Sequence, residues 1–411
     1  MIISTLFHLS VTAPWRRAIF AAAHCARYEL PIGARAFPRG LFQSNRCAGS
    51  ETTIIRTVEA QLAQDLISTL LVLDRPEDAS IFPQVGLDSS HRMFQDVYWR
   101  CVACFFATSA RQNPDARHAL FTNADELPTV EGLEMKDLMR RLGVDVVRLP
   151  ITHRLGRDKV KSWNNVFYIL DVIAHLDREG GFDRAVLLDS DCVWVRPADG
   201  LMADVARRGV LSMSIPYSYD EKLNGASRRD MVQAAQQLAG HSFDFVPNFS
   251  GGELFAATRS GLAEVGRAVS AMWSELLVSP PGEVRVYTEE HLFSIAYEML
   301  GVPTGTADPH IRRLWTALRL NNVTAEDVDS GRCAWHLPME KKTGFVDLFK
   351  AVKKRDSWLW TVPPEEVRLR VARVMGLPKR SPRQWVLQVE SRLRFYAGKR
   401  LRRFRTSVLL G

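Results

Sequence analysis

Residues 184–191 read RAVLLDSD, and this stretch decides the fold. Its apolar run from Ala185 to Leu188 predicts a buried strand, and the run ends abruptly in Asp189, Ser190 and Asp191. Polar residues at the carboxyl end of a central strand lie where α/β folds collect their ligands. Because side chains alternate along an extended chain, Asp189 and Asp191 are expected on one face, directed at one cation.

Two carboxylates in this position suit a hard divalent cation, Mg²⁺ or Mn²⁺, which prefers oxygen ligands and is readily shared with a substrate diphosphate. The alternative is that the acids cap a helix or lie solvated in a surface loop, as many Asp-x-Asp sequences do. The buried strand before them and the Cys-Val-Trp-Val-Arg-Pro sequence after them favour the metal site.

Short apolar runs alternate with longer helical patterns on both sides of this segment, which predicts an α/β domain with a largely parallel sheet. Besides the fourth strand at 184–191, strands are expected at 101–108 (the first), 118–124, 144–150, 210–216 and 252–258. Helices are expected at 132–143, 161–176, 260–277 and 289–300.

The composition is globular, since 46% of the 411 residues are hydrophobic and 24% are charged, and this excludes disorder over most of the length. The longest apolar run, residues 66–73, is too short to span a bilayer, so the protein is expected to be soluble or peripheral. The net charge of +8 arises from basic ends, 1–50 and 379–411, around a mildly acidic middle, which argues against a nucleic-acid-binding fold. The few cysteines, including Cys101 and Cys104 in an apolar stretch, indicate a reducing compartment.

Four regions are expected along the chain. Residues 1–50 form a poorly ordered extension, for which an export sequence is the alternative. Residues 51–97 form a helical preface with a helix over 57–73, residues 98–350 the α/β domain, and residues 351–411 a basic helical tail. The tail pattern fits either an amphipathic helix on an anionic membrane surface or a solvated helix packed on the domain. A cytoplasmic protein with peripheral contact at the inner face of the plasma membrane is expected.

The phrase RAVLLDSDCVWVRP resembles the corresponding strand, Asp-x-Asp and exit of GT-A fold glycosyltransferases, in particular the retaining enzymes of glycosyltransferase family 8. The resemblance covers about residues 98–350. It implies a GT-A (Rossmann-like) fold, with a mixed, mostly parallel sheet flanked by helices and with basic terminal extensions. It also implies that Asp189 and Asp191 hold a divalent cation between the phosphates of a nucleotide sugar, where the metal offsets the charge of the leaving diphosphate.

A second element of the resemblance lies at Cys333–Phe345, which reads CAWHLPMEKKTGF. In family 8 a late histidine is the third metal ligand and a lysine six residues later contacts the diphosphate, a spacing that His336 and Lys342 share. Lys341 is included beside Lys342. The family's glycine between histidine and lysine and its Lys-Pro-Trp ending are absent here, and a lone histidine is otherwise most often core or surface.

Weaker expectations concern the substrate. A tight turn before a strand (Asn248, Gly251, Gly252 and Glu253) resembles the acceptor-side loop, although such glycines also serve simple turns. Glu289 and Glu290 after Thr288 suit a helix start, and related retaining transferases place a carboxylate from such a start beside the donor sugar. Nucleoside, diphosphate or sugar contacts are expected at these further residues: Thr108, Ser109, Asn123, Asp125, Lys161 and Asn165.

The leading hypothesis is a metal-dependent glycosyltransferase acting on a glycan or lipid-linked acceptor, such as an envelope polysaccharide. A sugar-nucleotide nucleotidyltransferase is the second hypothesis, but the sequence after the first expected strand, ATSARQNPDAR (107–117), lacks the glycine-rich phosphate loop of that class. A third is a non-catalytic glycan- or membrane-binding protein on a degenerate transferase fold.

Overall fold

The computed structural model describes residues 65–80, 85, 88–160, 163–240, 244–317, 320–386 and 389–390. The chain divides into two units, Met1–Glu59 and Ala60–Gly411, and every described residue belongs to the second. The expected extension 1–50, the tail beyond residue 390 and Lys161 lie outside the described residues.

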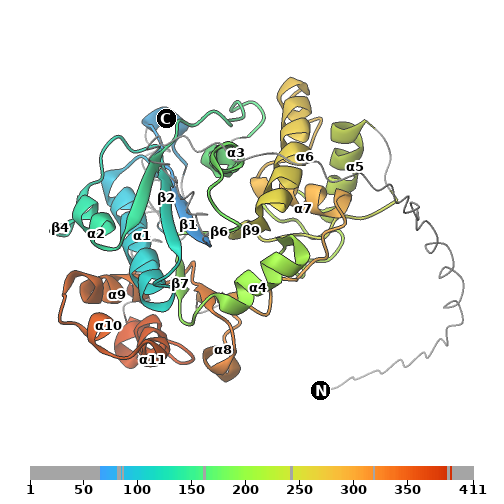
Figure 1. Cartoon of the computed structure of the whole chain (residues 1–411). Coiled ribbons are helices and arrows are strands. Elements are labelled where there is room, and N and C mark those ends of the chain that lie inside the picture. Colours follow the sequence, from blue (N-terminus) through green and yellow to red (C-terminus); the bar gives the residue numbers. More distant parts are fainter. Residues whose placement is uncertain are drawn as a thin grey trace, which may run out of the picture. The chain divides into compact units, whose positions relative to one another are not determined.

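A six-stranded sheet forms the centre of the described unit, in the order β5-β2-β1-β6-β9-β8 (Figure 1). Its strands are β1 (Leu66–Leu71), β2 (Arg117–Thr122), β5 (Val144–Arg148), β6 (Arg184–Leu188), β8 (Val210–Leu211) and β9 (Leu254–Thr258). The four strands from β5 to β6 are parallel, whereas β9 runs antiparallel to both β6 and β8. The protein is therefore α/β with a mixed, mostly parallel sheet.

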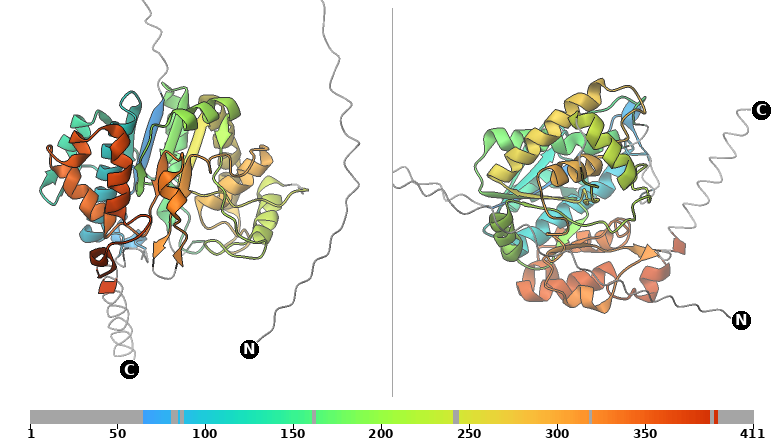
Figure 2. Two further views of the ribbon diagram at one scale, coloured as in Figure 1. Left: turned by 90° about the horizontal axis from the view of Figure 1, so that it is seen from below. Right: turned by 90° about the vertical axis from the view of Figure 1, so that its right-hand side faces the viewer.

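Helices cover both faces of this sheet, because its strands are apolar on both sides. On β6, Val186 and Leu188 belong to the core that contains α1, α9 and α11, and Ala185 and Leu187 belong to the core that contains α3, α6 and α7. Figure 2 shows the two helical layers on opposite sides of the strands. The helices are α1 (Arg92–Gln112), α2 (Met135–Arg141), α3 (Tyr168–Glu179), α4 (Asp199–Arg208), α5 (Arg228–Ala239), α6 (Arg259–Val278), α7 (Glu289–Met299), α8 (Ala325–Asp329), α9 (Gly344–Lys353), α10 (Trp358–Thr361) and α11 (Pro364–Met375).

Most elements between 117 and 300 are confirmed: strands β2, β5, β6 and β9 and helices α2, α3, α6 and α7 lie within or close to the expected ranges. The strand expected at 210–216 is shorter than predicted, since only Val210–Leu211 pairs in the sheet. None of the helices in the described ranges is long and apolar enough to cross a membrane.

The strand expected at 101–108 is wrong, because these residues lie inside α1. This helix is packed against β1, β7 and α9, so Cys101 to Ser109 are all buried. A helix that is buried on several sides reads as a continuous apolar run, and the run alone does not distinguish it from a buried strand.

The first strand is instead β1, within the range where a helix over 57–73 was predicted. β1 is hydrogen-bonded to β2 on one side and β6 on the other, and five of its six residues are buried. The expected boundary at 97 therefore does not separate a helical preface from the domain. The boundary at 350 is likewise wrong, because α10 and α11 contribute Leu359, Val367 and Val371 to the core that contains α1.

Candidate metal centre and ligand cavity

A cavity of about 430 Å³ opens at the carboxyl ends of β1 and β6. β2 and β5 extend the sheet on the far side of β1, and β9 and β8 extend it on the far side of β6, so the strand order reverses between β1 and β6. α/β folds form their ligand crevice at such a switch point. Leu70, Leu71 and Val72 line the cavity from the end of β1, and residues 189–191 line it from the end of β6.

A small second sheet, β10-β13-β7, brings distant residues to this crevice. β7 (Cys192–Trp194) begins directly after Asp191 and pairs antiparallel with β13 (Ala334–His336), which pairs in parallel with β10 (Ile311–Arg313). In this register His336 lies opposite Cys192, and Arg313 lies opposite His336. The Leu337 N–H donates to the Asp191 carbonyl oxygen at 3.0 Å and holds the strand ends together.

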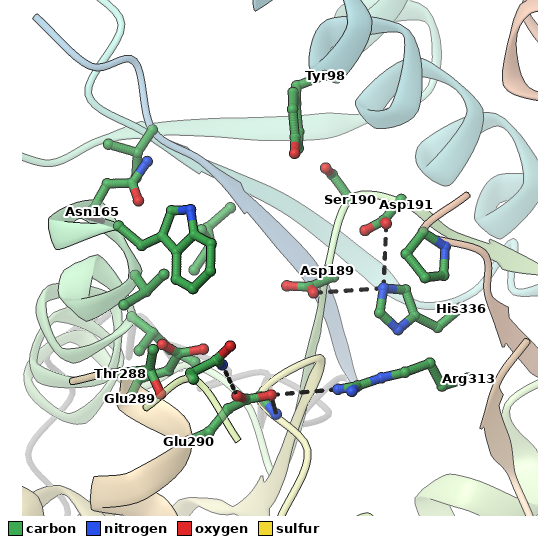
Figure 3. Close-up of a pocket in the computed structure, with 18 of the residues that line it drawn as sticks. Tyr98, Asn165, Asp189, Ser190, Asp191, Thr288, Glu289, Glu290, Arg313 and His336 are labelled. Carbon is green, nitrogen blue, oxygen red and sulfur yellow. Dashed lines mark hydrogen bonds and ion pairs between the residues drawn. The ribbon is translucent and has the colours of Figure 1, made fainter. Parts of the chain in front are cut away.

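Asp189, Asp191 and His336 form a candidate metal centre, since one ligand atom from each lies within 4.8 Å of the others. His336 Nε2 is 3.2 Å from Asp191 Oδ2 and 3.7 Å from Asp189 Oδ2 (Figure 3). The structure thus brings together the three residues that the sequence named as metal ligands.

The orientation of His336 fits a bound cation. Its Nδ1 is 3.1 Å from Glu253 Oε1, so its Nε2 is the nitrogen that faces the two aspartates. A metal-ligating histidine almost always donates its other ring N–H to a carboxylate or carbonyl in this way. Two carboxylates and an imidazole are ligands that Mn²⁺ accepts.

The electrostatics of the cluster favour positive charge at this point. Burial opposes protonation of His336, but the Asp191 and Glu253 carboxylates outweigh burial and raise its pKa to about 9. Desolvation within the cluster, although the side chain itself is 49% exposed, and the neighbouring Asp191 charge raise the pKa of Asp189. The pKa of Asp191 is lowered instead, because Lys341 and His336 outweigh its burial.

Lys341 is the lysine that reaches the centre. Its buried ammonium forms an ion pair with Asp191 Oδ2 and lies 5.3 Å from the centre of the Tyr98 ring. Lys342, which has the family spacing, is exposed and does not line the cavity. The buried Glu340 accepts hydrogen bonds from Thr343 Oγ1 and the Gly344 N–H and so holds the turn that directs Lys341 inward.

Glu289 and Glu290 line the cavity across from the aspartates (Figure 3). The Glu290 carboxylate is fully engaged, since it accepts from Asn224 Nδ2 at 2.6 Å and the Gly252 N–H at 3.2 Å and pairs with Arg313 at 3.4 Å. Glu289 Oε2, in contrast, is buried without a hydrogen-bond partner among the described residues. Burial and the adjacent Glu290 charge hold the pKa of Glu289 well above its usual range.

The tight turn before β9 supports this acidic wall. A Cβ atom at position 252 would overlap the Glu289 carboxylate, so glycine allows the backbone to approach α7 closely. Glu253 lies behind the cavity, where it pairs with Arg313 and His336. Gly251 donates its N–H to the Met213 carbonyl, and Asn248 is bonded to Glu298; neither lines the cavity.

The remaining wall is aromatic and amide in character. Asn165 lines it and donates to Asp74 Oδ2 at 3.2 Å. Trp163 also lines it, and its φ of 64° is a left-handed conformation that a bulky residue rarely adopts. Strained backbone of this kind is concentrated at ligand sites. Trp163 stands outside any motif in the sequence, as do Tyr98 and Arg313.

Four expected nucleoside contacts lie elsewhere. Thr108 and Ser109 are buried in α1, where Thr108 Oγ1 accepts from the Trp194 N–H and Ser109 Oγ is 2.8 Å from His118 Nε2. The expected position of both residues, at the carboxyl end of a strand over 101–108, is wrong because these residues lie inside α1. Asn123 bonds both backbone groups of Leu73, and Asp125 is exposed; neither lines the cavity.

Neither the protein-family models nor the curated proteins compared with this chain give a match.

Proposed function

We propose that this protein is a metal-dependent glycosyltransferase of the GT-A type, which transfers a sugar from a nucleotide diphosphate sugar to a hydroxyl group of a glycan or lipid-linked acceptor. The observation that carries the proposal is the convergence of Asp189, Asp191 and His336 at the sheet's switch point, at the edge of a ligand-sized cavity. The family 8 resemblance of the same residues implies the substrate class and retention of anomeric configuration.

Each wall of the cavity has chemistry that suits one part of such a donor. Asp189, Asp191 and His336 would hold Mn²⁺ or Mg²⁺, which as a Lewis acid would stabilise charge on the departing diphosphate. The Lys341 ammonium lies beside this centre and can pair with a phosphate oxygen. Trp163 and Asn165 offer a ring face and an amide to the nucleoside.

The acidic wall suits the sugar. The Glu290 carboxylate is held by Asn224, Gly252 and Arg313, so its position is fixed. Glu289 is therefore the carboxyl group that remains available to hydrogen-bond a hydroxyl of the donor or acceptor. A buried polar atom without a partner is costly in the free protein, and a ligand hydroxyl would satisfy it.

The nucleotidyltransferase alternative gains no support from the corrected topology. The first strand is β1, and the segment that follows it, residues 72–80, contains no glycine. The segment 107–117 also contains none. A phosphate loop of that class needs glycine so that backbone N–H groups can approach the phosphates.

Ligand-induced stabilisation tests the proposal without knowledge of the acceptor. The purified protein is titrated with UDP, GDP, CDP and dTDP, each with Mn²⁺ and with EDTA, and followed by thermal unfolding and calorimetry. A Mn²⁺-dependent shift with one nucleotide, lost in Asp189→Asn, supports the proposal and names the donor class. A folded protein that responds to none of them favours a binding protein on a degenerate transferase fold.

We also propose that the basic C-terminal stretch 379–411 meets an anionic membrane surface, where lipid-linked acceptors for envelope polysaccharides lie. Within the described part, Trp385, Val386 and Val389 are exposed apolar side chains. Arg380 instead faces inward and pairs with Glu340. Pelleting with anionic vesicles at low salt tests the role of the tail.

A further inference from the structure

Glu253 is a buried carboxylate that the cavity does not use directly. Its side chain is 0% exposed and lies behind the candidate metal centre. The Glu253 carbonyl oxygen accepts from the Asp189 N–H at 3.0 Å, so the backbone of residue 253 is bonded to the Asp-x-Asp turn as well. A buried carboxylate is retained only where charged or hydrogen-bonding partners compensate for its desolvation.

Arg313 supplies most of that compensation. Its Nε is 2.6 Å from Glu253 Oε1, and its Nη2 pairs with Glu253 Oε2, so both carboxylate oxygens are held by one planar guanidinium group. The same Nη2 is 3.4 Å from Glu290 Oε1. Figure 3 shows Arg313 extending from the side of His336 towards Glu290, between the metal centre and the acidic wall.

Glu253 in turn acts on His336. An ionised carboxylate can only accept hydrogen bonds, so His336 Nδ1 must carry the proton in this contact. With the Nδ1 proton held by Glu253, Nε2 is the nitrogen that can exchange its proton for a cation and offer its lone pair to that cation beside the two aspartates. The protein thereby selects the tautomer that can ligate a cation between them.

We propose that Arg313 and Glu253 are positioning residues for the metal centre: Arg313 orients Glu253, and Glu253 fixes the tautomer and ring orientation of His336. This inference rests on the metal centre of the proposed function. Neither residue is a metal ligand in it. The contact of Arg313 with Glu290 makes the same guanidinium the link between the metal centre and the wall that would hold the sugar.

Glu253→Gln is the most direct test, because the neutral amide has one acceptor and one donor group. Oε1 accepts from both Arg313 Nε and His336 Nδ1, and Oε2 accepts from Arg313 Nη2, so the NH₂ group of glutamine faces an N–H donor at either position and the side chain can no longer hold His336 and Arg313 together. Mn²⁺ affinity is then expected to fall 10- to 100-fold, the range typical of partners that orient metal ligands. The matched control is Glu298→Gln, the same substitution at a carboxylate that bonds Asn248 and lies outside the cavity lining.

The readout is Mn²⁺ binding itself, by electron paramagnetic resonance titration in the absence of nucleotide. Electron spin echo modulation from the imidazole ¹⁴N reports whether His336 ligates the ion, and His336→Gln gives the spectrum without that ligand. The unchanged protein and Glu298→Gln are expected to show equal affinity and the ¹⁴N modulation. Glu253→Gln is expected to bind Mn²⁺ 10- to 100-fold more weakly and to show reduced ¹⁴N modulation.

A folded Glu253→Gln protein with unchanged affinity and unchanged ¹⁴N modulation would overturn the positioning role and leave the metal centre standing. Absence of Mn²⁺ binding by the unchanged protein would overturn the metal centre and the positioning role with it. If Glu253→Gln does not fold, Arg313→Lys tests the positioning role instead, because lysine keeps the charge but cannot hold both carboxylate oxygens of Glu253. Weaker Mn²⁺ binding by Arg313→Lys supports the role, and unchanged binding overturns it.

Discussion

Asp189 and Asp191 belong to one short motif, yet the structure predicts a large loss of stability when Asp191 is neutralised and almost none when Asp189 is. Asp191 has a buried carboxylate that pairs with the buried Lys341 ammonium and lies 3.2 Å from His336. Asp189 has a side chain that is 49% exposed, and its ion pair with His336 is longer, at 3.7 Å. We compare Asp191→Asn with Asp189→Asn in the absence of metal.

The magnitude follows from what each substitution leaves behind. Asp191→Asn strands the Lys341 ammonium, whose side chain is only 7% exposed, and removal of one partner of a buried ion pair costs ~3–5 kcal/mol. Such a loss lowers the melting temperature by roughly 4–7 °C in a domain of this size. Asp189→Asn removes a half-exposed charge that its neighbour Asp191 repels, so its effect is expected within ~1 kcal/mol of zero.

Denaturant and thermal unfolding in EDTA measure the stability of the two variants, and Mn²⁺ titration measures their metal affinity. Both variants are expected to lose Mn²⁺ binding. The double variant Asp191→Asn/Lys341→Met is expected to recover most of the stability but not the metal affinity, because no charge is left buried without a partner.

Equal stability of Asp191→Asn and the unchanged protein would refute this reasoning, as would an equally large loss in Asp189→Asn. The practical consequence is that Asp189→Asn is the cleaner variant for testing function, because loss of binding in it cannot be attributed to a weakened fold.

Three further predictions follow from other parts of the structure. Burial lowers the pKa of His118 and of His291 to about 4, whereas each residue protonates near pH 6.5 in the unfolded chain. The free energy of unfolding is therefore expected to fall by up to ~3 kcal/mol per residue as the pH drops from about 6.5 to 4. If His291→Gln leaves the slope of unfolding free energy against pH unchanged, this prediction is wrong. Lys341→Gln is expected to weaken the binding of Mn²⁺-nucleoside diphosphate by about tenfold or more in calorimetry, whereas Lys342→Gln changes it less than about twofold. The reason is that Lys341 lines the cavity and Lys342 does not. Equal effects of the two substitutions would contradict this prediction. Deletion of 391–411 is expected to abolish salt-sensitive pelleting with anionic vesicles and to leave the melting temperature unchanged, because the Arg380–Glu340 ion pair is kept. Deletion from 379 onwards also removes Arg380 and is expected to lower the melting temperature. Continued pelleting without 391–411 would exclude that stretch as the anchor.

Much of the α/β pattern could be predicted because it is local. The apolar run of β6 and its abrupt end in Asp189 and Asp191 specify a buried strand and its polar terminus within eight residues. The period of α3 and the Thr-Glu-Glu start of α7 are equally local, and the structure agrees with both. Local patterns fail where burial is complete: the apolar run 101–108 predicts a strand where α1 lies, and the pattern over 57–73 predicts a helix where β1 lies.

The site was predictable only as far as motif and resemblance reached. Asp189, Asp191 and His336 were named from the sequence, but the sequence spacing pointed to Lys342 where the structure selects Lys341. The turn held by Glu340 decides between the two lysines, and neither residue's own neighbours reveal the difference.

By itself, therefore, the sequence determined the α/β class, the strand that carries the two aspartates and the acidic start of α7. Only the tertiary structure decided that Arg313, Glu253 and His336 form one hydrogen-bonded chain behind those aspartates. The physical reason is that this chain depends on strand register: β10, β13 and β7 come from separate parts of the sequence, and their pairing alone puts Arg313 opposite His336 and His336 opposite Cys192. Register of this kind is set by packing and backbone hydrogen bonds between distant segments, which no local pattern records.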